Sequence, residues 1–505
     1  MDKTKKEMEN LKFRRQFLFT AKKCDVLQSW NSENLGSHYL YTHPDCGMTR
    51  VNTGKFELLL IGYILDPKRE ESTDLDILKT ISTISSIHDM AEKLYSLTGR
   101  FVLLIKEDNE FTFFHDPCGL KMLFYTYSNQ ELYAASQPLL LELVTDVKKG
   151  NKYKDYYASQ YVKENIEHWI PSGSSLYDDV SHLVPNHYIN SSISKQIRYW
   201  PNTKLGQIPL IQSVNIFFFI LKMSMHAADK RFKLTLPLTA GWDSRIILAS
   251  SKDILNDIWS YTLKYRDLTE ESNDIKVPKN LSEYLSFKYT VIDCNKPVDK
   301  TFSKIYENNT DIPHMNDWGK IAYGMQDAYP ENGIAVKGNC SEVGRCFYFP
   351  NGKHTKIDSS QNFLDLVPYW EDIGFIQERI FEWYEEVKLE NIHMGYDLYD
   401  LFYWEHRMGS WQAQSQLEWD IVQEVFSPFN NRELFDTMLS LQPKYRVGTS
   451  NLLFRKSIEN LWKETLMEPI NYLSPRQRIQ NMTKDILVKI GIFDTLKSML
   501  NKVSR

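Results

Sequence analysis

The sequence predicts a mixed fold class, α+β in its first part and α/β in its second, and three observations support this prediction. Residues 1–155 contain several short apolar runs with strand composition, which is typical of a β-rich sandwich. From residue 208 onward, short apolar runs alternate with helical stretches, and this alternation predicts a parallel sheet with helical crossovers. Beyond about residue 360 the pattern is almost wholly helical.

Size and composition are those of a soluble globular protein. The 505 residues, 42% of them hydrophobic, allow two or three domains. A net charge of -5 gives no reason to expect nucleic acid as a partner. The start is charged, which argues against a signal peptide, and the most apolar stretch, 214–223, is too short to form a transmembrane segment. Six cysteines without a C-x-x-C pair predict a reduced, cytoplasmic compartment.

The first 155 residues contain four runs with the composition of strands, at 14–20, 56–63, 100–105 and 110–115. The last two flank a hairpin-like connection. Residues 74–97 have a helical pattern between the second and third runs. We expect residues 156–205 to connect this part of the chain to the next.

The segment 232–249 is the most informative part of the chain. A strand-like run is followed by small residues with a glycine, and then by the first turns of a helix. The N–H groups of a first helical turn and the helix macrodipole together form an anion cradle. Ser244 can add a hydroxyl donor, and Asp243 can hold a magnesium ion against a phosphate chain. The alternative is an ordinary strand–helix turn of an α/β domain.

Three further runs predict neighbouring parallel strands, at residues 258–263, 289–293 and 333–337. Ligands of such a sheet bind beyond the carboxyl ends of its strands, where the loop 237–245 lies. This edge is therefore the predicted phosphate-binding site.

Several segments share their order and spacing with one known family. The loop 239–244 resembles S-G-G-x-D-S of the ATP pyrophosphatases. The other matching segments are 97–101, 115–125, 183–187 with 199–200, 336–342, 426–431 and 451–455. Together they resemble the asparagine synthetases, which join a class II glutamine amidotransferase domain to an ATP-pyrophosphatase domain.

The resemblance implies four parts of the chain. These are an amidotransferase-like (Ntn-type) sandwich over 1–155, a connector over 156–205, a PP-loop ATP-pyrophosphatase domain over 206–475 and a basic helical tail over 476–505. We expect the tail to pack on its own domain; the alternative is contact with a partner, a second copy or a membrane surface.

The resemblance also implies the activation of a small-molecule or peptide carboxylate by ATP and Mg²⁺. A carboxylate oxygen attacks the α-phosphorus, and an amine then displaces AMP. The residues implied to bind ATP and pyrophosphate are Leu238, Thr239, Ala240, Gly241, Trp242, Asp243, Ser244, Arg245, Leu263 and Gly338. The implied metal ligands are Asp243 and Glu342, and Arg245 either points to a phosphate or lies on the surface.

A second set of residues recurs at steps of three and four, and therefore falls on one face of a predicted helix. Its members are Asp397, Asp400, Trp404, Arg407, Trp411, Gln414 and Glu418. So mixed a face predicts the wall of a polar pocket, and the alternative is a salt-bridged contact between helices. In the family this region faces the acyl substrate, which implies Asp400, Trp404, Trp411 and Glu418 as pocket residues and Arg407 as catalytic. Glu405, Gln412 and Gln416 are expected to be solvated.

Two departures from the family pattern limit the predicted activity. Class II glutaminases expose an N-terminal cysteine, but residue 2 is Asp2, and neither Cys24 nor Cys46 has a free α-amine. The family's lysine in K-Y-I-L-R falls on Asn451, which leaves Lys444 and Lys456 as candidate catalytic lysines.

The predicted function is therefore an AMP-forming ligase without glutaminase activity, using ammonia or an amine. The alternatives are a non-catalytic nucleotide-binding or scaffold protein and a glutamine-hydrolysing asparagine synthetase.

Overall fold

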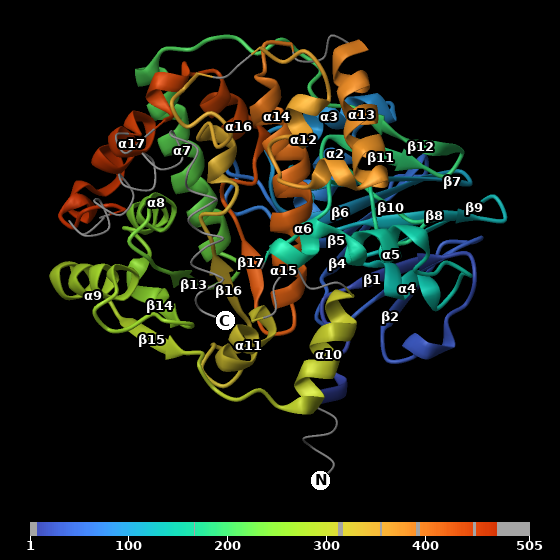
Figure 1. Cartoon of the computed structure of the whole chain (residues 1–505), viewed down its shortest axis with the longest axis horizontal. Coiled ribbons are helices and arrows are strands. Elements are labelled where there is room, and N and C mark those ends of the chain that lie inside the picture. The colour runs from blue at the N-terminus through green and yellow to red at the C-terminus, as the bar shows by residue number, and fades with distance from the viewer. Residues whose placement is uncertain are drawn as a thin grey trace.

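A computed structural model describes residues 8–165, 167–311, 317–353, 356–389, 394–447 and 451–471. Two six-stranded antiparallel sheets and one five-stranded parallel sheet make up its β structure, which confirms the predicted mixed α/β class. In Figure 1 the antiparallel sheets lie on the right and the parallel sheet on the left, with the helices of residues 398–419 between them.

The antiparallel sheets have the strand orders β10-β8-β9-β1-β3-β2 and β12-β11-β7-β6-β5-β4. Side chains such as Phe19, Leu104 and Phe113 fill the core between them, because successive strand residues point to opposite faces. The strands are β1 (Phe17–Thr20), β2 (Asn31–Asn34), β3 (Tyr39–Thr42), β4 (Met48–Asn52), β5 (Phe56–Leu65), β6 (Thr98–Glu107), β7 (Glu110–His115), β8 (Phe124–Ser128), β9 (Glu131–Ala135), β10 (Ser181–His182), β11 (His187–Asn190) and β12 (Ile193–Arg198). The four strands predicted within residues 14–115 are confirmed.

The expected connector, 156–205, also contributes strands to the two antiparallel sheets. Its strands β10 and β11 pair with β8 and β7, so the sandwich continues to residue 198. The helices over the two sheets are α2 (Asp74–Ile81), α3 (Met90–Leu94), α4 (Pro138–Glu142), α5 (Asn151–Ala158) and α6 (Gln160–Glu164).

The single helix predicted over 74–97 is wrong. A 3-10 turn, η2 (Ile87–Asp89), separates α2 from α3. The chain restarts there at Ser86, which forms a capping box with Asp89.

The parallel sheet has the order β15-β14-β13-β16-β17 and contains all four parallel strands expected from the sequence. Its strands are β13 (Lys233–Pro237), β14 (Trp259–Lys264), β15 (Tyr289–Asp293), β16 (Gly333–Val336) and β17 (Glu424–Phe426). Its surrounding helices are α7 (Leu210–Asp229), α8 (Trp242–Ser250), α9 (Asn273–Leu285), α10 (Lys300–Thr310) and α11 (Trp318–Met325).

Among the described helices, α7 alone is long and apolar enough to cross a membrane, and it is longer than the apolar stretch 214–223 suggested. Within the protein, 44% of the most apolar 18-residue stretch of α7 is buried. Phe217 and Leu221 of α7 pack in the main core, so its apolar face has a partner inside the fold.

The C-terminal part is helical apart from β17. Its elements are α12 (Gln361–Leu364), α13 (Gly374–Leu389), α14 (Leu398–Phe402), the π-helical segment η6 (Tyr403–Gln412), α15 (Ala413–Trp419), α16 (Arg432–Leu439) and α17 (Leu452–Trp462). Short 3-10 turns are η1 (Asp25–Leu27), η3 (Leu255–Asp257), η4 (Ser341–Gly344), η5 (Trp370–Asp372), η7 (Pro443–Tyr445) and η8 (Lys463–Leu466). The predicted basic tail, 476–505, lies outside the described residues.

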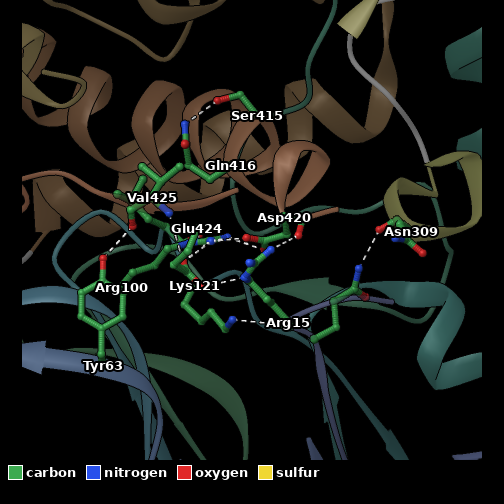
Figure 2. A network of polar contacts seen from close by, with 12 residues as sticks. Arg15, Tyr63, Arg100, Lys121, Asn309, Ser415, Gln416, Asp420, Glu424 and Val425 are labelled. Carbon is green, nitrogen blue, oxygen red and sulfur yellow. Dashed lines mark hydrogen bonds and ion pairs between the residues drawn. The ribbon is translucent and has the colours of Figure 1, made fainter. Parts of the chain in front are cut away.

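A buried charge network joins the sandwich to the parallel sheet (Figure 2). Arg100 of β6 binds Asp420, which follows α15, with Nη2 donating to Oδ2 at 2.8 Å, and binds Glu424 of β17 at 2.8 Å. Arg15 and Lys121 lie in the same network, with Arg15 Nε 3.5 Å from Glu424 Oε2. The network fixes β17, and with it the neighbouring β16, relative to the sandwich.

Candidate functional site

The loop between β13 and α8 has the form of an anion cradle. The helix begins at Trp242 after Gly241, and no side chain caps it. Within the described residues, the N–H groups of Trp242 and Asp243 meet no acceptor. Such N–H groups and the macrodipole attract an anion. The neighbouring N–H of Ala240 already donates to a carboxylate oxygen, Oδ1 of Asp274, at 3.0 Å.

The predicted second nucleotide loop lies directly against this cradle. A Cβ atom at Gly338 would stand 2.6 Å from Cβ of Asp243, so only glycine fits there. Oδ1 of Asp243 accepts hydrogen bonds from Ser341 Oγ, at 2.5 Å, and from Arg345. Two loops about a hundred residues apart therefore converge on one carboxylate.

Glu342 places a second carboxylate near Asp243. Burial, and then the negative charge of Asp243, raise the pKa of Glu342 to about 7. Its Oε2 is buried and has no hydrogen-bond partner in the described structure. Burial alone lowers the pKa of Arg345, but the charges of Asp243 and Glu342 raise it overall. An acid whose pKa is raised beside a charged one is suited to accept a further cation.

The two carboxylates fit a magnesium ion that arrives with a nucleotide. Mg²⁺ is typically held by one or two carboxylates together with substrate phosphates and water. The part of the chain that the structure describes contains no group of three or more His, Cys, Asp or Glu residues able to hold a metal. A metal here therefore depends on phosphate oxygens, and Arg345 competes with it for Asp243.

Ser244 and Arg245 bind the protein's own backbone. Ser244 Oγ donates to the carbonyl oxygen of Thr239 at 3.0 Å. Arg245 is 1% exposed, and its Nη1 donates to the carbonyl oxygens of Thr465 and Glu468 at 2.6 and 2.8 Å. The expected surface position of Arg245 is therefore wrong, whereas its expected phosphate contact stays a prediction.

The C-terminal segment 463–471 passes beside the cradle. The N–H of Asn471 donates to the carbonyl oxygen of Ala240 at 3.0 Å. Asn280 of α9 donates to Oε1 of Glu468 at 3.0 Å. This segment therefore forms one wall of the space around the loop 239–245.

The predicted polar face over 397–418 is wrong, because the helix changes its pitch. The π-helical segment η6 has wider turns than an α-helix, so residues at steps of three and four leave their common face. Glu405, Gln412 and Gln416, which were expected to be solvated, are 0%, 2% and 2% exposed. Glu405 Oε2 accepts from Arg198 at 2.9 Å and from Trp383 at 2.7 Å, which satisfies its buried charge.

Of the residues expected at an acyl pocket, Arg407 and Trp411 stay together, with the guanidinium 4.2 Å from the ring centre, while Asp400, Trp404 and Glu418 bind different parts of the protein. Their partners include Arg446 for Asp400 at 2.8 Å, the Pro117 carbonyl for Trp404 at 2.8 Å, Glu167 for Arg407 at 3.6 Å and the Tyr306 hydroxyl for Glu418 at 2.7 Å. Glu418 remains on the side of the parallel sheet, whereas Trp404 reaches into the sandwich.

Neither candidate lysine contacts the two loops within the described structure. Lys444 lies in η7 and Lys456 in α17, and both are exposed. Asn451 caps α17, with Oδ1 accepting from the N–H of Phe454 at 3.3 Å. Leu263, near the end of β14, is half-buried.

Two cations at this edge of the sheet are not apparent from the sequence. Arg345 lies beyond the matched segment 336–342, so no motif drew attention to it. Lys337 directly follows β16 and lies within the matched segment 336–342, but neither the motif nor the strand pattern gives it a role. Its amine lies 3.4 Å from Oε1 of Gln416 and 4.2 Å from the centre of the Trp419 ring.

No protein-family model matches this chain, and no curated protein matches it. One similar solved structure is the glutamine phosphoribosylpyrophosphate amidotransferase from B. subtilis complexed with ADP and GMP, at 11% identity and a TM-score of 0.24, over 57% of this chain and 62% of that one. Another is the allosteric regulatory enzyme of purine biosynthesis, at 12% identity and a TM-score of 0.25, over 46% of this chain and 56% of that one. This chain thus spans about three-fifths of the chains it matches, and similarities this low carry no argument about its function.

Proposed function

We propose that this chain binds ATP between the loops 239–245 and 338–345 and uses it to activate a carboxylate, as an AMP-forming ligase. The main support is the convergence of an uncapped helix N-terminus, Asp243 and Gly338 at the carboxyl edge of a parallel sheet. Backbone donors at that place suit a polyphosphate. In the proposed reaction a carboxylate oxygen bonds to the α-phosphorus while the bond to pyrophosphate breaks, and an amine then displaces AMP.

Each group at the junction of the loops has a proposed role. The N–H groups of Trp242 and Asp243 hold the leaving pyrophosphate, where donors aimed at developing charge lower the barrier. Arg345 neutralises charge beside them. Mg²⁺, when bound by Asp243 and Glu342, supplies further neutralisation of the phosphates.

The N-terminal sandwich serves in this proposal as a scaffold that resembles an amidotransferase. Its motif residues face the interface: Asn430 donates to Asp116 Oδ1 at 2.7 Å and to the carbonyl oxygen of Gly99 at 2.9 Å. Cys24 and Cys46 are 5% and 4% exposed. We therefore propose ammonia or a second substrate, and not glutamine, as the source of the amine.

A second candidate function is nucleotide binding without ligation. The ion pair between Arg345 and Asp243 favours it, because the guanidinium occupies a carboxylate that the metal would use. The exposure of Lys444 and Lys456 favours it as well, since neither supplies a buried cation.

Exchange of labelled pyrophosphate into ATP, measured over a broad panel of carboxylic acids, distinguishes the two functions. The ligase proposal expects exchange that depends on one class of acid and is lost in Asp243→Asn. The matched control is Asp327→Asn, since the side chain of Asp327 is 84% exposed. ATP binding without exchange for any acid supports the second candidate, and exchange that survives Asp243→Asn refutes the role of Asp243.

A further inference from the structure

Lys337 lies between the strand and the loop that define the proposed site. Its N–H donates to the carbonyl oxygen of Phe426 at 2.8 Å, which continues the pairing of β16 with β17 by one residue. Ala335, two positions earlier, lies in the core shared with α10, α11 and α15. Since strand residues two apart point to the same face, the Lys337 side chain points to that face too.

The opposite face of the sheet carries the anion cradle. Val336 packs in the same core cluster as Ile246 and Ile247 of α8, the helix whose N-terminus forms the cradle. Lys337 therefore reaches the carboxyl edge from the side away from the polyphosphate. A ligand bound at Lys337 would therefore approach this edge from the face opposite to a ligand in the cradle.

Lys337 is half-buried and lacks the carboxylate partner that several buried arginines of this protein have. Arg100, Arg198 and Arg446 each bind a buried carboxylate, namely Asp420, Glu405 and Asp400. In the described structure no carboxylate oxygen lies within 4 Å of the Lys337 amine, whose neighbours are the amide of Gln416 and the ring of Trp419. The half-buried ammonium group therefore has a hydrogen bond and a ring contact but no counter-charge, and a ligand anion can supply one.

We propose that Lys337 binds the carboxylate of the acyl substrate and positions it for attack on the α-phosphorus. This inference rests on the proposed function. The ammonium group donates hydrogen bonds to one carboxylate oxygen while the other oxygen forms the new bond to phosphorus. The electron pair of the broken phosphorus–oxygen bond leaves with pyrophosphate, and Lys337 keeps its protons throughout.

The charges around Lys337 agree with this role. Burial, and then the charge of Arg100 on β6, lower the pKa of Lys337 to about 7, although Asp420 after α15 raises it. A bound carboxylate favours the ammonium form and raises this pKa. Carboxylate binding therefore takes up a proton near pH 7, and the affinity falls as the pH rises above 7.

Two experiments on the full chain test the inference. In the first, the acid found by pyrophosphate exchange is titrated against Lys337→Met and Lys337→Arg. We expect the KM for the acid to rise by at least about tenfold in Lys337→Met and less in Lys337→Arg, while the KM for ATP changes by less than about twofold. The control is Lys356→Met, an exposed lysine paired with Asp358 at 2.8 Å. An unchanged KM for the acid in Lys337→Met overturns the inference about Lys337, but it leaves the proposed ligase function standing.

The second experiment needs no turnover. Lysines are labelled competitively with acetic anhydride between pH 5 and 10, in sodium acetate or in sodium chloride of equal ionic strength. We expect Lys337 to titrate near pH 7 in chloride and to be protected by acetate, which acts as a simple carboxylate. Labelling of Lys337 that acetate leaves unchanged, or no labelling at any pH, contradicts the inference even if no acid supports exchange.

Discussion

The replacement Arg100→Met tests whether the sandwich holds the proposed site in place. Arg100 and Asp420 are each 1% exposed, and the guanidinium also binds Glu424. The variant leaves two carboxylates near one another without their main cation. Breaking a buried ion pair by removing one partner costs about 3–5 kcal/mol, so we expect the free energy of unfolding at pH 7 to fall by that amount.

The loss of stability in Arg100→Met should depend on pH. Burial alone raises the pKa of Glu424, but Arg100, Lys121 and Arg15 lower it to about 2 in the folded protein. This carboxylate therefore stabilises the fold above its unfolded pKa of about 4.5, and the contribution is lost as the pH falls toward 2. The deficit of Arg100→Met should shrink over the same range.

Urea unfolding followed by tryptophan fluorescence measures the effect, with Lys388→Met as a control. Lys388 forms an exposed pair with Glu385 at 3.2 Å, which is worth less than about 1 kcal/mol. Adding Asp420→Asn to Arg100→Met should recover part of the loss, because one buried charge disappears. An Arg100→Met variant no less stable than Lys388→Met would refute this reasoning.

Three further predictions concern the loops. Gly338→Ala places a Cβ 2.6 Å from Cβ of Asp243, and overpacking of about 1–3 kcal/mol should weaken ATP binding by about tenfold in calorimetric titrations. Arg245→Met removes the donor to two carbonyl groups of the segment 463–471, and limited proteolysis should cut that segment sooner than in the wild type. Asn451→Lys loses a helix cap, so thermal or urea unfolding should show about 1 kcal/mol less stability, and pyrophosphate exchange should not rise.

Controls for these variants come from positions outside the site. Gly374→Ala meets no atom within 4 Å and should bind ATP as the wild type does. Arg69→Met removes a half-exposed pair with Asp66 and should leave cleavage near the C-terminus unchanged. Equal ATP affinity in Gly338→Ala, equal cleavage in Arg245→Met, or faster exchange in Asn451→Lys would each contradict the geometry on which the prediction depends.

The strands could be predicted because their signal is local. Runs such as 100–105 and 333–337 are apolar and bounded by turn residues, and both form strands. The prediction of one polar helical face over 397–418 is wrong for a different local reason. It depends on an α-helical period, whereas η6 is a π-helix. The local sequence does not indicate this change from α-helical to π-helical pitch.

The site was predictable only where a short motif contained it. The cradle at 239–245 and Gly338 came from motif matches, and the structure places them in contact. The partners of Glu405 and Asp243 lie far along the chain, with 207 residues separating Glu405 from Arg198 and 102 separating Asp243 from Arg345. Such pairings depend on the assembled fold, so the helical period of 397–418 predicts Glu405 as solvated, and no local pattern marks Arg345.

A crystal structure of the protein with a non-hydrolysable ATP analogue and Mg²⁺ would show where the nucleotide binds. We expect the polyphosphate at the N-terminus of α8, beside Asp243 and Gly338, with the α-phosphorus facing the side of the sheet that carries Lys337. A nucleotide bound elsewhere while this junction stays empty would contradict this expectation.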